Sequence, residues 1–138
     1  MSGTNPILSG GGFHHVALRV VDFDKAVAFY QALGFVPAVE WGQAPKRAVM
    51  MDTGDGNYLE TFEGGLAETP SEGRIIHFAL RTANCDRAQA TALAAGAVET
   101  MAPKDVTIQS SRGPVPVRIS FVRTPSGELV EFFQNELT

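Results

Sequence analysis

Hydrophobic and polar positions alternate along the chain in short runs that predict a strand, a helix and three strands. Residues 13–20 have the period of two expected of a strand, and residues 23–33 have apolar side chains at helical spacing. Asp22 is placed to cap the start of this helix and Gly34 to end it. The strands predicted after the helix are residues 36–41, 47–53 and 58–63, with a glycine-rich turn between the last two.

The second half of the chain predicts the same order of elements. The predicted elements are a strand at 75–82, a helix from Asn84 to Ala95 that ends at Gly96, a weak strand near 97–101, and strands at 115–123 and 128–134. The stretch from Ala102 to Pro114 has no clear period, and we expect it to be a loop over the functional site.

The two halves are also related by sequence. His15-Val-Ala-Leu-Arg19 returns 62 residues later as His77-Phe-Ala-Leu-Arg81, and nine of the twenty positions 15–34 are identical at this offset. Unrelated segments would give about one or two identities. We interpret the chain as one domain, residues 1–138, composed of module one (13–63), a linker (64–74) and module two (75–134).

Each module is therefore predicted to be βαβββ, with one face of its sheet covered by its own helix. The predicted fold class is α+β, with two tandem βαβββ modules that form a curved, partly open, eight-stranded mixed sheet with the helices outside. Since residues two apart in a strand share a face, the apolar residues of 15–20 pack on the helix and leave His15 and Arg19 on the opposite face. The second module places His77 and Arg81 in the same way.

Two carboxylates stand inside the apolar strands that end the modules. Glu60 and Glu131 are costly there unless a charge partner neutralises them. Together with His15 and His77 they make one histidine and one glutamate per module, a donor set that suits a divalent metal ion. Taken singly, each histidine also fits a hydrogen-bonded strand residue, and each glutamate also fits a partner of Arg19 or Arg81. The recurrence of the pair in both modules favours the metal site.

Composition narrows the class of protein. Eleven basic and fifteen acidic residues give a net charge of −4, unlike the basic surplus of a nucleic-acid-binding protein. The sequence has no apolar run long enough to span a membrane, and its start has no secretory-signal pattern. The single cysteine, Cys85, cannot form an internal disulfide. We therefore expect a cytoplasmic protein that binds neither nucleic acid nor membranes.

These residues resemble a known family. His15-Val-Ala-Leu-Arg-Val, followed by Phe29-Tyr30 and Leu33-Gly34-Phe35, resembles the opening of vicinal oxygen chelate proteins, the superfamily of glyoxalase I, bleomycin-resistance proteins and extradiol dioxygenases. His77-Phe-Ala-Leu and Pro125-Ser-Gly-Glu-Leu-Val-Glu131 resemble the signatures of the family's second module. The resemblance covers nearly all of the chain after residue 12.

The resemblance implies a site and a reaction. Its four metal positions fall on His15, Glu60, His77 and Glu131, and this set is similar to that of glyoxalase I, a lactoylglutathione lyase. It implies one divalent ion (Ni, Co, Zn, Mn or Fe), enediolate chemistry on a hemithioacetal or a related α-hydroxycarbonyl compound, and glutathione as a co-substrate. Glu60 and Glu131 are the candidate catalytic residues and Arg19 the candidate for holding a substrate carboxylate, with Arg81 as a second candidate.

Other activities remain open within this resemblance. Bleomycin-resistance-type proteins sequester a ligand without metal or catalysis, and thiol transferases and extradiol dioxygenases use two histidines and one glutamate. The resemblance further implies a homodimer in which His15 and Glu60 of one subunit meet His77 and Glu131 of the other, although some members close the site within one chain. The chain also departs from glyoxalase I, because Glu63-Gly64-Gly65 stands where that enzyme has a glutathione-binding asparagine.

Overall fold

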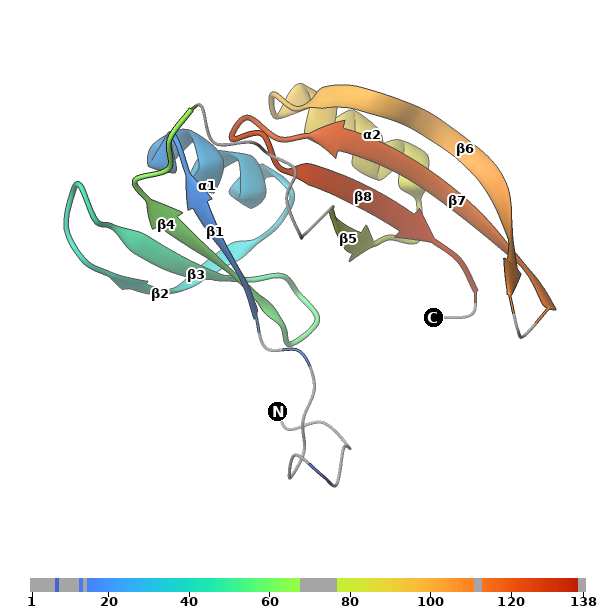
Figure 1. The fold of residues 1–138 in the computed structure, drawn as a ribbon, viewed down its shortest axis with the longest axis horizontal. Helices are drawn as coiled ribbons and strands as arrows, with labels where there is room; N and C mark the ends of the chain where they lie inside the picture. Colours follow the sequence, from blue (N-terminus) through green and yellow to red (C-terminus); the bar gives the residue numbers. More distant parts are fainter. Residues whose placement is uncertain (1–6, 8–12, 14, 68–76, 111–112, 137–138) are drawn as a thin grey trace. The chain divides into compact units, whose positions relative to one another are not determined.

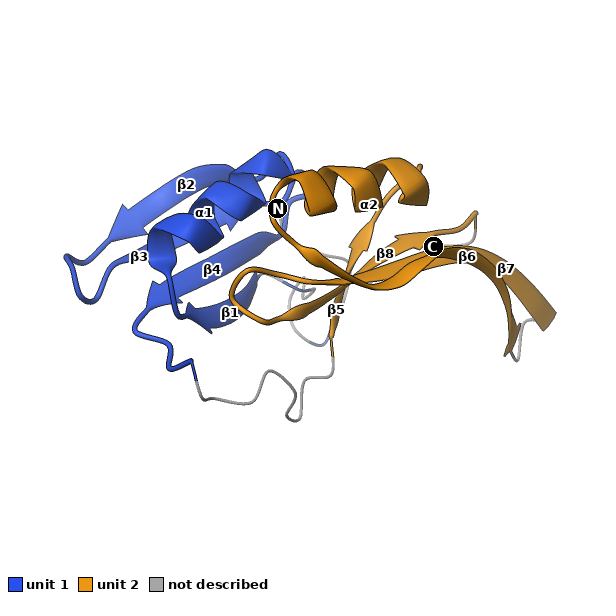
Figure 2. Ribbon diagram, turned by 90° about the horizontal axis from the view of Figure 1, so that it is seen from above, with its two compact units in different colours: residues 1–67 blue, residues 68–138 orange. Residues whose placement is uncertain are grey.

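The computed structural model describes residues 7, 13, 15–67, 77–110 and 113–136 (Figure 1). It divides into two compact units, residues 1–67 and 68–138 (Figure 2). Each unit has the element order strand, helix and three strands, which confirms the tandem βαβββ modules. The predicted linker 64–74 runs across the boundary between the units, and its residues 68–74 lie outside the described residues. That the chain is one domain stays a prediction.

Unit 1 contains a four-stranded sheet covered on one face by a helix. Its elements are β1 (His15–Val20), α1 (Phe23–Ala32), β2 (Val36–Trp41), β3 (Ala48–Asp52) and β4 (Tyr58–Glu63). The strand order is β1-β4-β3-β2, with β1 parallel to β4 and the other pairs antiparallel. The Asp22 carboxylate accepts a hydrogen bond from the Lys25 amide at 3.0 Å and caps α1 as predicted. Gly34 follows α1 with a φ of 90°, the left-handed conformation that ends a helix.

Unit 2 repeats this plan. Its elements are β5 (Phe78–Arg81), α2 (Cys85–Ala94), β6 (Val98–Ser110), β7 (Gly113–Arg123) and β8 (Leu129–Gln134), and the strand order is β5-β8-β7-β6. The eight strands thus lie in two four-stranded sheets, one in each unit. Of the helices in the described ranges, none is long and apolar enough to cross a membrane.

The prediction of a loop at Ala102–Pro114 is wrong. Residues 102–110 belong to β6, and β7 begins at Gly113, so most of this stretch is a β-hairpin. β7 pairs with β8 only from Arg118 onwards, while residues 113–117 pair with β6 alone among the described strands. The prolines of this stretch are tolerated because it lies at the edge of the sheet, where a missing N–H costs no ladder hydrogen bond.

The core of each unit lies between its helix and its sheet. In unit 1, Val20 is fully buried and Leu59 is 3% exposed, and both face α1 with Phe29 and Tyr30. Alternate residues of the same strands face away from the helix, so β1 leaves His15, Ala17 and Arg19 exposed, as predicted. We call this uncovered side of each sheet its open face.

Both units fasten the first turn of the helix to the sheet with the same ion pair. The Arg47 guanidinium donates to the Asp24 carboxylate at 2.9 Å, and the Arg118 guanidinium donates to Asp86 at 2.6 Å. Arg47 also donates to Glu63 at 2.7 Å and lies over the Phe23 ring at 4.6 Å. This Arg–Asp contact, which we call the clamp, is thus part of the duplicated architecture. It fixes the helix on the side of each sheet opposite the open face.

This clamp predicts a pH-dependent contribution to stability. The Arg47 guanidinium lowers the pKa of Glu63 below its ordinary value of 4.5. The stabilisation is therefore present above pH 4.5 and is lost as the pH falls through the lowered pKa of the folded state. Glu63→Gln is expected to lower the midpoint of thermal unfolding at pH 7 and to match the wild type near the acid limit. Circular dichroism melts across this range test it, with exposed Glu136→Gln as the control, and a gap that is constant with pH would contradict it.

Candidate metal centre

The open face of unit 1 brings one predicted histidine and one predicted glutamate together. His15 begins β1 and pairs with Tyr58 of β4, so Glu60 is its diagonal neighbour on the same face. His15 Nε2 lies 3.4 Å from Glu60 Oε2. The His15 side chain is 39% exposed and the Glu60 side chain 13%. The imidazole is therefore accessible to solvent, while the carboxylate is largely buried.

The open face of unit 2 repeats the arrangement. His77 directly precedes β5, and its Nε2 lies 3.1 Å from Oε2 of Glu131 in β8. The Phe121 ring packs edge-on against the imidazole with 5.2 Å between ring centroids. Burial raises the pKa of Glu131, and the attraction of His77 opposes that rise. The two pairs thus occupy equivalent positions of the duplicated modules, as the sequence predicted.

The structure brings together two of the four predicted ligands in each unit. Within the described part of the chain, no three histidine, cysteine, aspartate or glutamate side chains gather into a group able to hold a metal ion. A complete site therefore needs the two pairs to combine, within one chain or between two. The four-ligand site stays a prediction.

The spacing inside each pair suits a shared cation. Two ligand atoms about 2.1 Å from one metal ion lie about 3.0 Å apart at a right angle and about 3.4 Å apart at the tetrahedral angle. The observed distances, 3.1 and 3.4 Å, fall in this range. The 3.1 Å contact of unit 2 also suits a hydrogen bond from the imidazole to the carboxylate, whereas the 3.4 Å contact of unit 1 is longer than such bonds usually are. Both spacings therefore fit two ligands of one cation.

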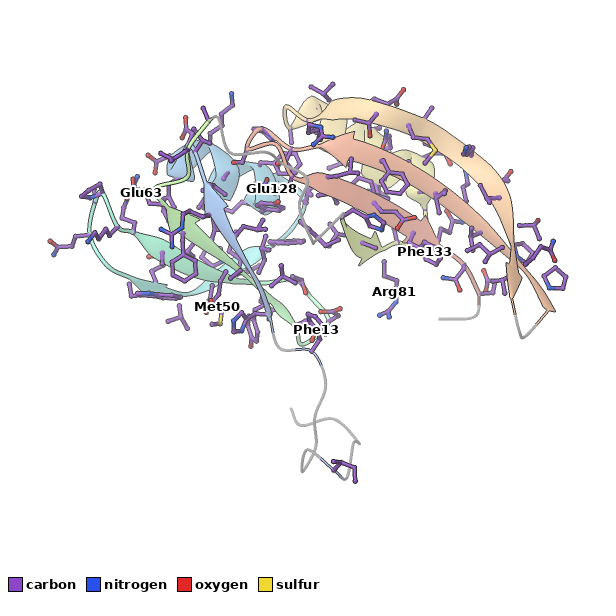
Figure 3. All side chains as sticks on the ribbon, in the orientation of Figure 1. Phe13, Met50, Glu63, Arg81, Glu128 and Phe133 are labelled. Atoms are coloured by element: carbon purple, nitrogen blue, oxygen red, sulfur yellow. The ribbon has the colours of Figure 1, made fainter. Side chains whose placement is uncertain are left out.

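An arginine accompanies each pair. Arg19 and Arg81 stand four residues after the histidines and are exposed, and their side chains make no hydrogen bond or ion pair with any residue the structure describes. Arg19 pairs in register with Phe62, and Arg81 with Phe133. Figure 3 shows the Arg81 side chain extending away from β5. With respect to the described residues, both guanidinium groups are therefore available to an anionic group of a ligand.

Apolar side chains surround the pair of unit 1. Trp41 packs edge-on against Phe62 with 5.8 Å between ring centroids. Met50, which is labelled in Figure 3, pairs in register with Glu60. Met50 was not among the predicted site residues. Met50 and Met51 are adjacent in β3, so their side chains lie on opposite faces of the sheet. Since Met51 is fully buried, this alternation could have placed Met50 on the open face.

Comparison with known proteins identifies the family. Residues 12–132 match the model of the Glyoxalase/Bleomycin resistance protein/Dioxygenase superfamily. The chain belongs to this superfamily, the vicinal oxygen chelate proteins. No curated protein matches the sequence significantly.

Solved structures agree with this assignment at the level of the fold. A mutant of glyoxalase I from Zea mays has a TM-score of 0.72 and 18% identity over 89% of this chain and 45% of its own. A glyoxylase/bleomycin resistance protein/dioxygenase domain from Frankia sp. has a TM-score of 0.72 and 17% identity, with 91% and 98% covered. An antibiotic binding protein from a Streptomyces strain has a TM-score of 0.68 and 18% identity, with 93% and 98% covered. The fold therefore occurs in both enzymes and binding proteins.

Proposed function

We propose that the protein is a divalent-metal-dependent lyase of the glyoxalase I type that isomerises a hemithioacetal or a related α-hydroxycarbonyl compound. The observation that carries the proposal is the pair of His–Glu contacts, 3.4 Å in unit 1 and 3.1 Å in unit 2, at equivalent positions of the two modules. The two pairs together supply two imidazoles and two carboxylates, a donor set that suits one divalent ion with positions left for substrate.

His15, Glu60, His77 and Glu131 are the residues that would hold the metal ion, which is Ni, Co, Zn, Mn or Fe. When bound, a divalent ion supplies Lewis-acid stabilisation of the negative charge that an enediolate carries. The set has two neutral imidazoles and two carboxylates, so the ligands carry a charge of about −2 against the +2 of the ion. The proposal further places the site in a homodimer, with one pair from each subunit.

The carboxylates provide the proton transfer. Glu60 or Glu131 takes a proton from one carbon of the substrate and returns it to the neighbouring carbon, the work of a general base that then acts as a general acid. Arg19 holds a substrate carboxylate, because its guanidinium is exposed and has no protein partner among the described residues. Arg81 is the second candidate for this role. The proposal also places the protein in the reducing cytoplasm, with a small molecule as its substrate.

The direct test is spectrophotometric. Purified protein is loaded in turn with each of the five metals and given methylglyoxal with glutathione, and then with other thiols. Formation of the thioester product with at least one metal and thiol is the expected result. No turnover with any combination would retire the lyase, and oxygen consumption with a catechol or thiol addition to an epoxide would assign a different activity to the same ligands.

A metal-free binding protein is the second candidate. It is favoured by the apolar side chains that cover the open face of unit 1, where Met50, Phe62 and Trp41 lie around Glu60. Its test is calorimetric titration of the metal-free protein with bleomycin and with an aromatic antibiotic. Micromolar binding that metal neither strengthens nor weakens would support sequestration, whereas binding only with metal would support the enzyme.

A further inference from the structure

We propose that Phe121 is a positioning residue, which fixes the His77 imidazole and makes the His77–Glu131 pair the more ordered half of the metal site. The consequence for metal binding rests on the proposed function, whereas the ring contact itself does not. The Phe121 ring packs edge-on against the His77 ring, with 5.2 Å between the ring centroids and 84° between the ring planes. Aromatic pairs prefer such edge-on geometry at centroid distances of about 4.5–7 Å. The contact therefore has the geometry of a favourable ring pair.

The backbone of His77 leaves the orientation of its imidazole open. The described pairing of β5 with β8 begins at Phe78, whereas His77 directly precedes the strand. The outer torsion of a histidine side chain has broad, roughly two-fold minima, so strand geometry alone does not fix the ring plane. The Nε2 atom lies 3.1 Å from Glu131 Oε2, which restrains one edge of the imidazole. The Phe121 ring is a second contact, and it restrains the plane of the imidazole.

Phe121 is itself held firmly enough to support another ring. It pairs in register with Glu131 of β8 on one side and with Met101 of β6 on the other. From the helix side of the sheet, the buried Gln89 amide of α2 donates to the carbonyl oxygens of Met101 and Phe121 at 3.3 and 3.4 Å. These hydrogen bonds lie where the register between β6 and β7 shifts. The backbone that carries the Phe121 ring is thus fixed from both neighbouring strands and from the helix.

Unit 1 has other residues at the equivalent positions. Met50 pairs in register with Glu60, the position that Phe121 has relative to the glutamate of unit 2. Val27 stands 62 residues before Gln89, and its side chain has no amide. Methionine has three rotatable side-chain bonds and adapts its shape, so it restrains a neighbouring ring less than phenylalanine does. The two His–Glu pairs therefore share their ligand types but differ in the side chain that supports the histidine.

Phe121→Met tests the proposal, because it gives unit 2 the side chain that unit 1 already has at the equivalent position. In the metal-free protein, carbon-13 relaxation of the imidazole rings, assigned with His77→Ala, measures how ordered the His77 ring is. Phe121→Met is expected to lower this order. Ile119→Met is the matched control and should not, because it places the same side chain on the same face of β7, two residues away. Equal order of the His77 ring in wild type and Phe121→Met would overturn the proposal.

Metal affinity separates positioning from packing. In competition titrations with Co(II), Phe121→Met is expected to bind about 2–10-fold more weakly than the wild type, the range of one aromatic contact, and Ile119→Met to bind as the wild type does. The visible absorption of bound cobalt, which depends on coordination geometry, should change in Phe121→Met alone. If Phe121→Met loses thermal stability but keeps the wild-type cobalt affinity and spectrum, Phe121 only packs and the proposal is overturned. If the wild type binds no cobalt, the proposed function fails, and the order of the His77 ring alone decides whether Phe121 fixes it.

Discussion

Replacing Glu60 with glutamine is expected to remove stoichiometric metal from the purified protein. The substitution keeps the size of the side chain but removes the charged oxygen that lies 3.4 Å from His15 Nε2. Changes to groups that only support a ligand already cost about 10–100-fold in metal affinity, so loss of a ligand charge should cost at least about 100-fold. Elemental analysis after dialysis against a defined metal buffer measures the effect, and Glu136→Gln is the control with an exposed carboxylate.

His77→Ala should also remove stoichiometric metal, although the substituted residue lies in the other unit. If all four side chains bind one ion, either single substitution empties the whole site. If each His–Glu pair binds metal by itself, each substitution removes only half of the metal. Loss of half of the metal in both variants would therefore contradict a shared site and would indicate that each His–Glu pair binds metal by itself.

A mixture of the two variants tells a shared site from one closed within a chain. In a dimer that combines pairs from different subunits, one Glu60→Gln chain and one His77→Ala chain form one intact site and one doubly damaged site. Random reassociation of equal amounts should then restore about a quarter of the wild-type sites. If the site lies within one chain, every site keeps a lesion and the mixture recovers nothing.

The sequence predicted most of the architecture because its signals are local. Asp22 and Asn84 precede apolar residues at helical spacing, and both side chains cap their helices as their residue types require. Alternation along β1 assigned His15 and Arg19 to the open face because an apolar strand face must be buried. The duplication then placed His77 and Glu131 by analogy, and the 3.1 Å contact between them follows.

What the sequence missed depends on contacts between distant segments. Pro103 and Pro114 lie in the stretch that was predicted to be a loop, yet they belong to β6 and β7. Whether a proline interrupts a strand depends on whether a neighbouring strand needs its N–H, and β8 ends before it reaches that part of β7.

The second large effect concerns the proton transfer. With metal at saturating concentration, glutamine in place of the carboxylate that moves the proton is expected to lower kcat by about 10²–10⁴-fold, the contribution of a positioned general base. Glutamine in place of the other carboxylate should act mainly through metal affinity and so recover most of its kcat. Steady-state kinetics of Glu60→Gln and Glu131→Gln, each over a range of metal concentrations, separates the two roles.

Arg19→Ala provides the matched comparison, because it removes a group that is proposed to bind substrate without moving a proton. It should raise KM for a thiol that carries a carboxylate and leave kcat, and the turnover of an uncharged thiol, nearly unchanged. Solvent exchange gives an independent readout: reaction in deuterium oxide should place deuterium on the product carbon in the wild type and in Arg19→Ala. If both glutamine variants kept their kcat at saturating metal, neither carboxylate would be the base, and the histidine–glutamate pairs would serve binding alone.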